Sequence, residues 1–452
     1  MSKRKRSKAV SLPIVEANAA GIDIGATQIF VAVPADRDVE SIRCFDTFTA
    51  DLERLADWLE QCQIRTVAME STGVYWIPLF QILEERKIEA CLVNAQHLKN
   101  VPGRKKTDVE DCQWIQHLHS VGLLRGSFRP DQEICAIRSL WRHRDNLIQL
   151  ATIHLQHMQK ALDQMNLQIH HVISDLAGTT GLAIVDAILA GERDLAKLAQ
   201  LRDWRIRASE ETIMKSLVGD YREEHLFTLR QSLQSYRHYQ HLIQEVDGQV
   251  KQMMRRLPGR VDIGEKPLPK EKNPRKTPWR NEPPQLREDL YRAFGVDLTQ
   301  IPGIHTLTAQ MLLTEIGPDL SRFPTAAAFC SWLRLCPEPK ISGGKVLSSK
   351  TRPTKNRAAL ALRMAAQGLH RSQTFLGDYF RRMKARLGTP KAMTAAAHKL
   401  ARIVYHMITT RQEYDTTVFQ ELERRVQDRK RMKLRAQARA LGFELVPREA
   451  VP

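Results

Sequence analysis

Cysteine is scarce in this chain of 452 residues, and long apolar runs are absent from it. The seven cysteines are odd in number, form no CxxC pair and show no His/Cys metal-ligand spacing. This pattern excludes a disulfide scaffold, so we expect a reduced, intracellular protein without structural zinc. No stretch is long and apolar enough to cross a bilayer, and we expect no membrane partner.

Negative charge is also in short supply. Asp and Glu number 51 against 69 Lys and Arg, which gives a formal net charge of +18. Such an excess predicts a polyanionic partner, and nucleic acid is the commonest one. The length allows two or three domains with substantial cores.

Residues 19–130 alternate strand-like and helix-like segments. An apolar run around Asp23 and the β-branched run after it predict a hairpin, and strand–helix alternation follows, with a helix beginning at Asp108. This order predicts a mixed α/β sheet compatible with the RNase H-like (RuvC-like) fold. Residues 131–257 carry apolar residues at heptad-like spacing, interrupted at Arg144 and His154. They predict a helical or coiled-coil domain whose seam is buried either within one chain or in a dimer.

Residues 258–285 hold seven prolines and seven Lys or Arg, and predict an extended, flexible, basic linker. Residues 286–412 predict a helical C-terminal domain. In it, Pro302-Gly303-Ile304 suggests the turn of a helix-hairpin-helix, and a Gly-rich polar loop follows at 342–344. Residues 413–452 form a basic tail. The candidate nucleic-acid contacts are Lys105, Lys106, Lys276, Arg280, Lys345, Lys350, Arg352, Lys355 and Arg357.

Four acids have settings that suit a metal-bound carboxylate. Asp23 lies between Gly21 and Gly25 in an apolar strand, where an unpaired carboxylate is costly. Glu70 ends another expected strand, while Asp108 and Asp111 share one face of a helix start. Taken alone, Asp108 suits a helix N-cap and Glu70 a solvent-facing strand end. Together, the four favour a site for two hard cations that serves phosphoryl transfer.

The segments GIDIG, AMESTGVYW and GRKKTDVEDCQWIQHL, with the IPGI turn and the PKISGGK loop, resemble the DEDD transposases of the insertion-sequence one-ten family. The resemblance spans about residues 19–408. It implies cut-and-join recombination of an insertion sequence with its target DNA, guided by a structured bridge RNA. It also implies Mg²⁺ at the four acids (two ions, replaceable by Mn²⁺), a homodimer or tetramer, and a cytoplasmic, nucleoid-associated setting in a bacterium or archaeon. Cys112 departs from the family pattern, in which a small residue such as alanine is expected.

The resemblance makes Ser342 the nucleophile. From the residues alone, a serine beside two glycines is more often a turn residue, and Ser348 and Ser349 lie nearby. A serine hydroxyl needs a base or a metal to attack, and no Ser/His/Asp triad is visible in the loop. Two other functions stay open. One is a RuvC-like structure-specific endonuclease that hydrolyses DNA with two metals and no covalent intermediate, and the other is a non-catalytic nucleic-acid-binding scaffold.

Overall fold

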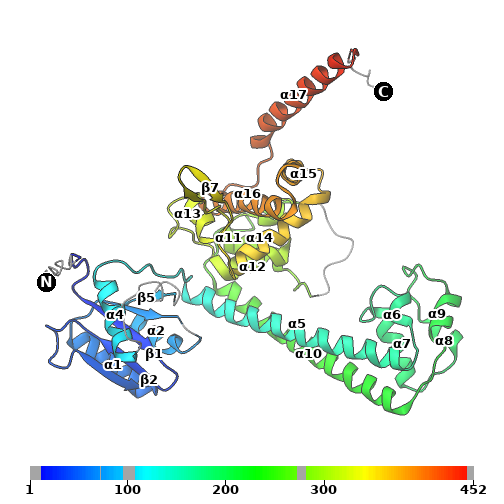
Figure 1. Cartoon of the computed structure of the whole chain (residues 1–452). Coiled ribbons are helices and arrows are strands. Elements are labelled where there is room, and N and C mark those ends of the chain that lie inside the picture. Colours follow the sequence, from blue (N-terminus) through cyan, green and yellow to red (C-terminus); the bar gives the residue numbers. More distant parts are fainter. Residues whose placement is uncertain (1–11, 72, 95–106, 272–280, 445–452) are drawn as a thin grey trace, which may run out of the picture. The chain divides into compact units, whose positions relative to one another are not determined.

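The computed structural model describes residues 12–71, 73–94, 107–271 and 281–444 (Figure 1). The chain divides into two compact units, Met1–Arg129 and Pro130–Pro452. Within the described residues, no helix is long and apolar enough to cross a membrane.

The first unit is built on a five-stranded mixed sheet of order β3-β2-β1-β4-β5. β1 pairs antiparallel with β2, and β2 with β3, whereas β1–β4 and β4–β5 are parallel. The expected hairpin and mixed α/β sheet are therefore confirmed. The strands are β1 Ala19–Ile24, β2 Gln28–Ala32, β3 Ile42–Asp46, β4 Thr66–Glu70 and β5 Glu89–Val93.

Helices cover both faces of this sheet. α1 (Thr49–Gln61) and α2 (Trp76–Glu85) pack on one face, where the core includes Ile22, Val67 and Met69. α4 (Asp108–Ser120) covers the other face, and its Ile115 and Leu118 pack against Ala68 and Val93. Because side chains alternate along a strand, Ile22 and its two neighbours in sequence point to opposite faces. Asp23 and Glu70 follow Ile22 and Met69 in the sequence, so they lie on the face that α4 covers.

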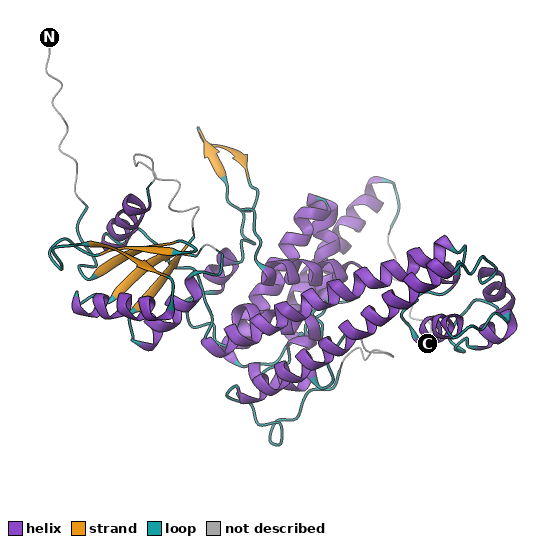
Figure 2. Ribbon diagram, turned by 90° about the horizontal axis from the view of Figure 1, so that it is seen from below, coloured by secondary structure: helices purple, strands orange, loops and turns teal. Residues whose placement is uncertain are grey.

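The second unit contains an antiparallel pair of long helices, α5 (Gln132–Gln164) and α10 (Glu223–Arg256), seen side by side in Figures 1 and 2. Their apolar seam is buried within the chain, with Leu147, Ala151, Leu229, Leu233 and Ile243 in one core. The structure agrees with the interpretation of the seam as a core within one chain for these residues.

Arg144, which the heptad pattern marks as an interruption, is 2% exposed and forms an ion pair with Asp247 of α10. It also donates a hydrogen bond to the carbonyl of Asn281 and lies over the ring of Trp141. A buried guanidinium needs such partners, because an unpaired buried charge is costly. The pair fixes the register of α5 on α10.

A small helical cap joins the two long helices at their far end (Figure 1). Its helices are α6 Ile169–Val172, α7 Thr179–Leu189, α8 Leu195–Gln200 and α9 Glu210–Ser216.

The C-terminal part of the second unit is a helical domain with one two-stranded sheet. Its elements are α11 Leu286–Phe294, η1 Leu298–Gln300, α12 Thr306–Ile316, α13 Ala326–Trp332, β6 Lys340–Ser342, β7 Lys345–Ser348, α14 Arg357–Gly368, η2 Leu369–Arg371, α15 Phe375–Leu387, α16 Thr389–Thr410 and α17 Thr417–Ala440.

The expected helix-hairpin-helix is modified in two respects. The segment before the turn is a single 3-10 turn, η1, and the turn itself packs on α14. Gly303 has a φ of +90°, and a Cβ there would lie 2.6 Å from the carbonyl oxygen of Ala365. Glycine is required at this position both for its backbone conformation and for the close approach.

Hydrogen bonds hold the expected linker in the segments that the structure describes. The carbonyls of Pro269 and Lys270 accept hydrogen bonds from Arg287 and Gln300, and Arg144 binds the carbonyl of Asn281. Residues 258–271 and 281–285 are therefore held against the helical domain, which differs from the flexible linker expected. Lys276 and Arg280 lie outside the described residues.

Candidate active site

The strand register places Asp23 and Glu70 side by side on one face of the sheet. Asp23 pairs with Phe30 of β2, Phe30 pairs with Cys44 of β3, and Glu70 pairs with Val93 of β5. The parallel register of β1 and β4 runs through Ile22 opposite Met69, and one further step sets Asp23 opposite Glu70. Val93 packs under α4, so the whole row faces that helix.

α4 approaches this face at Gly21. A Cβ at Gly21 would lie 2.1 Å from the backbone nitrogen of Gln116 and 2.3 Å from the carbonyl oxygen of Cys112. The helix backbone therefore rests directly on β1, which only glycine permits. At the other end of α4, His119 Nε2 and the Thr66 hydroxyl form a buried hydrogen bond of 2.9 Å. These two contacts fix the direction of α4, whose first turn lies toward the Asp23 end of β1.

Asp108 and Asp111 lie in that first turn. Thr107 is the N-cap, and its hydroxyl accepts a hydrogen bond from the Glu110 backbone N–H, so the N-cap alternative for Asp108 is wrong. Asp108 is exposed and Asp111 is half-buried. Carboxylates are favourable at a helix N-terminus, where the backbone N–H groups carry partial positive charge.

Two neighbouring cysteines lie close to three of the four acids. Burial raises the pKa of the Cys112 thiol to about 12, and the charges of Asp23 and Asp111 add to that effect. Burial likewise raises the pKa of Cys44, with smaller contributions from Asp46 and Asp108. Cys44 stands two strands from Asp23 in the same row. The sheet and α4 thus supply acids to a common region.

The four carboxylates do not form a closed cluster. Among the described residues, the group of ligand atoms that all lie within 4.8 Å of one another is formed by Asp163, His170 and His171 instead. Like charges repel, so a closer approach of the four acids needs cations between them. Their donors are all carboxylate oxygens, which hard divalent cations prefer, and the donor set therefore fits such ions.

Ser342 lies in the second unit, at the tip of the β6–β7 hairpin. It pairs with Lys345 across Gly343 and Gly344, whose φ values are +53° and +75°. Positive φ at both central residues is the requirement of a two-residue type I′ turn, which explains the two glycines. The hairpin stands out from the helices in Figure 2, and Ser342 is exposed whereas Ser348 is half-buried.

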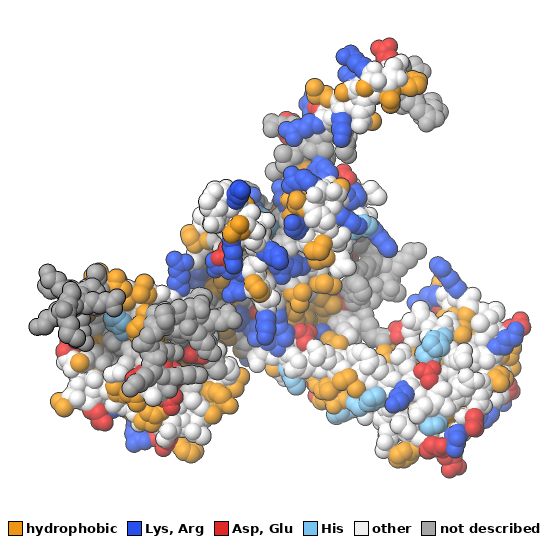
Figure 3. All heavy atoms as spheres, viewed as in Figure 1, with side chains coloured by type: hydrophobic (Ala, Val, Ile, Leu, Met, Phe, Trp, Pro, Cys, Tyr) orange, Lys and Arg blue, Asp and Glu red, His pale blue; other side chains and the backbone are white. Residues whose placement is uncertain are grey.

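Cationic side chains surround this hairpin, and Lys and Arg gather over the C-terminal domain in Figure 3. Lys345, Lys350 and Lys355 are exposed. Two of the other candidates are engaged within the chain. Arg352 is exposed and pairs with Glu338, and Arg357 is half-buried and forms a 3.1 Å ion pair with Asp145 of α5. Lys105 and Lys106 lie outside the described residues.

Comparison with known protein families agrees with this arrangement. A DEDD transposase model of the IS110 type matches residues 20–167. A second model, Transposase IS116/IS110/IS902 family, matches residues 297–379. The chain belongs to the IS110 family of DEDD transposases. It is therefore an enzyme that cleaves and rejoins DNA, and its DEDD domain implies a divalent metal. No curated protein matches the chain.

Three features of the transposase escaped sequence reasoning. Gly21 is needed for the close approach of α4 to β1. In the sequence, the feature that could have indicated this contact is a glycine two residues before Asp23. Cys112, a departure from the family pattern, is fully buried beside that glycine, so the site accepts a small thiol. The grouping of Asp163 with His170 and His171 had no recognised spacing in the sequence.

Proposed function

We propose that this transposase recombines an insertion sequence with its target DNA through a four-acid metal site and a serine nucleophile, guided by a structured RNA. The observation that carries the proposal is the row of residues that sets Asp23 beside Glu70 under the acidic first turn of α4. Carboxylates on a first strand, a neighbouring strand end and a late helix also suit an RNase H-like domain.

Asp23, Glu70, Asp108 and Asp111 would hold the divalent ions, with Mg²⁺ the expected species. When bound, these ions supply charge neutralisation at the phosphate oxygens and a lowered pKa for a coordinated hydroxyl. The residues themselves contribute geometry. Strand pairing holds Asp23 and Glu70, and the contact at Gly21 holds the helix that carries the other two. A preorganised ligand set avoids the cost of ordering these side chains during the reaction.

Ser342 would attack the DNA phosphorus. Its Oγ–P bond forms while the bond from phosphorus to one deoxyribose oxygen breaks, and the serine proton leaves to a base. The leaving deoxyribose oxygen takes up a proton and becomes a free hydroxyl. The serine–DNA phosphodiester retains the energy of the broken bond, so attack by a DNA hydroxyl rejoins the strand and releases the serine. The exposed position of Ser342 and the turn set by two glycines support this role, because a large substrate needs unobstructed access.

The cations near the hairpin support contact with DNA and a guide RNA. Lys345, Lys350 and Lys355 would bind phosphates, which position the nucleic acid without reading its sequence. A homodimer or tetramer would present two DNA ends together. The seam of α5 and α10 is occupied within the chain, so such an assembly would use other surfaces.

The test is whether protein becomes covalently attached to DNA. Wild-type protein with a labelled DNA substrate, guide RNA and Mg²⁺ should give a slow-migrating adduct on a denaturing gel. Ser342→Ala should give none, and Ser348→Ala, a matched serine on the same hairpin, should retain it. Cleavage without any adduct in the wild type would favour two-metal hydrolysis, and an adduct in Ser342→Ala would assign the nucleophile elsewhere.

A further inference from the structure

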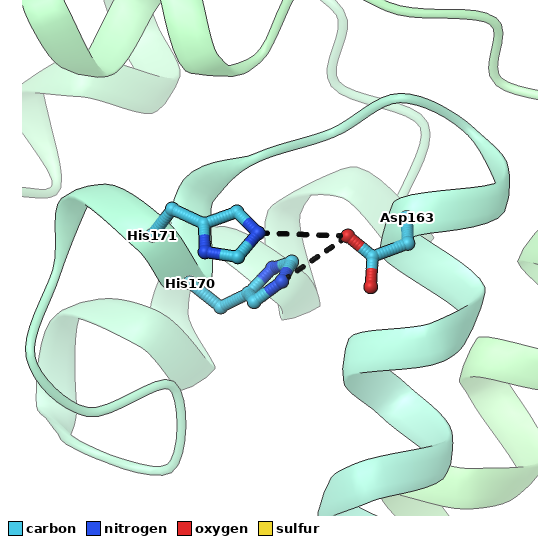
Figure 4. A group of neighbouring side chains, drawn as sticks. All are labelled: Asp163, His170 and His171. Carbon is cyan, nitrogen blue, oxygen red and sulfur yellow. Dashed lines mark ion pairs between the residues drawn. The ribbon is translucent and has the colours of Figure 1, made fainter.

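The base of the cap holds a group of side chains that the recombination chemistry does not use. Asp163 stands in the last turn of α5, and His170 and His171 are the two central residues of the short helix α6. Figure 4 shows both imidazole rings turned toward one carboxylate oxygen. The His170 Nε2 lies 3.2 Å and the His171 Nε2 3.9 Å from the Asp163 Oδ1.

We propose that Asp163, His170 and His171 bind one divalent transition-metal ion of the Zn²⁺ class, which fastens the cap to the end of α5. Zinc bonds to imidazole nitrogen and carboxylate oxygen are about 2.0–2.2 Å long, so two ligands of a tetrahedral ion lie roughly 3.3 Å apart. The observed 3.2 Å separation is close to that value, and the 3.9 Å separation needs a shift of about 0.6 Å. All three ligand atoms lie within 4.8 Å of one another.

An ordinary ion pair explains this arrangement less well. One imidazole is enough to pair with a carboxylate, yet here a second ring lies beside the first, with centroids 4.2 Å apart. Two cationic rings at that distance would repel each other, whereas a single metal cation is attracted to two neutral imidazoles and a carboxylate together. Neutral imidazole is the form that binds a metal.

The exposure of the three residues fits a bound ion with open coordination positions. The His170 side chain is only 8% exposed, whereas those of Asp163 and His171 are 55% and 65% exposed. His170 Nδ1 is buried without a hydrogen-bond partner among the described residues, so the contact at Nε2 orients this ring. His171 also lines an open groove of about 790 Å³, from which water can complete the coordination shell.

The position explains what the ion would do. At this point the chain leaves α5 for the cap and returns from the cap to α10. Two backbone hydrogen bonds join the two segments: the Asp220 N–H donates to the Met165 carbonyl, and the Gln168 N–H donates to the Ser216 carbonyl. Gly219 lies so close to Met165 that a Cβ would be 2.2 Å from its carbonyl oxygen. A metal bridge from α5 to α6 would stiffen this junction. This inference departs from the expectation of a protein without structural zinc, which considered cysteine-containing patterns.

Calorimetric titration with ZnCl₂ tests the proposal on the full chain without a histidine tag. Excess MgCl₂ is included to occupy the four-acid site. We expect one zinc ion per chain, and at least about tenfold weaker binding in His171→Ala and in Asp163→Asn. His171 is exposed, so its replacement should leave the fold intact, which circular dichroism verifies.

The matched control is His241→Ala. His241 also pairs with a carboxylate, that of Glu245 at 3.3 Å, but that pair belongs to no group of three ligands among the described residues. Its replacement should leave zinc affinity unchanged. Amide hydrogen exchange of residues 163–175 should slow on adding zinc in the wild type and not in His171→Ala. No magnesium-insensitive zinc binding in the wild type, or wild-type binding in both ligand variants, would overturn the proposal.

Discussion

Replacing Gly21 with alanine should disable the four-acid site without touching any acid. The new Cβ would lie 2.1 Å from the Gln116 nitrogen and 2.3 Å from the Cys112 carbonyl oxygen. Ordinary van der Waals contact begins at 3.4 Å, so α4 must withdraw from β1 by about 1 Å. Overpacking of this kind costs about 1–3 kcal/mol of stability. A misplacement of about 1 Å in a catalytic group can lower the rate roughly 100-fold.

The assay is DNA cleavage measured at a temperature at which circular dichroism shows the variant to be folded. Two variants isolate the cause. Gly248→Ala in α10, where a Cβ meets nothing within 4 Å, should keep full activity and gain about 0.5–1 kcal/mol. The double variant Gly21→Ala with Cys112→Ala should stay impaired, because the clash is with backbone atoms. Wild-type cleavage by folded Gly21→Ala would refute the argument that this contact positions the acids.

Three further outcomes are expected. Asp111→Asn should abolish cleavage while filter binding shows DNA affinity retained, and full cleavage would remove Asp111 from the site. The double variant Lys345→Ala with Lys355→Ala should bind DNA more weakly and with a smaller salt dependence. Each lost phosphate contact reduces the slope of log K against log salt by about one. An unchanged slope would show that the DNA binds elsewhere. Burial lowers the pKa of His119, so between that value and about 6.5 the unfolded state binds a proton that the folded state does not. Stability should therefore fall as pH falls below about 6.5, a loss that His119→Gln should diminish in thermal melts at several pH values.

Local patterns in the sequence were sufficient for the sheet and the nature of the helical domains. The apolar run around Asp23 and the β-branched run after it predicted the β1–β2 hairpin, and the acids stood out because burying a carboxylate is costly. The choice between a seam within one chain and a seam between two could not be made from heptad spacing, since both bury the same residues. Leu233 and Ile243 look alike in either case.

Contacts between residues far apart in the sequence could not be predicted from local sequence patterns. Nothing local to Arg144 indicates that it meets Asp247 and the backbone of Asn281, more than 100 residues away. Proline and basic residues in 258–285 predicted a flexible linker, but the hydrogen bonds that hold it come from Arg287 and Gln300 in a later domain. Likewise, nothing local to Arg357, one of the cations expected to meet nucleic acid, indicates that it forms an ion pair with Asp145.

The long helix pair also has a mechanical consequence. At 1.5 Å per residue, the 33 residues of α5 extend for about 50 Å. Arg144, the 13th residue of α5, anchors this arm through Asp247 and Asn281, and the cap occupies its far end. A tilt of about 5° at the base would displace the cap by about 4 Å, given that length. The arm therefore acts as a lever, through which a small rearrangement beside the C-terminal domain becomes a large displacement of whatever the cap holds.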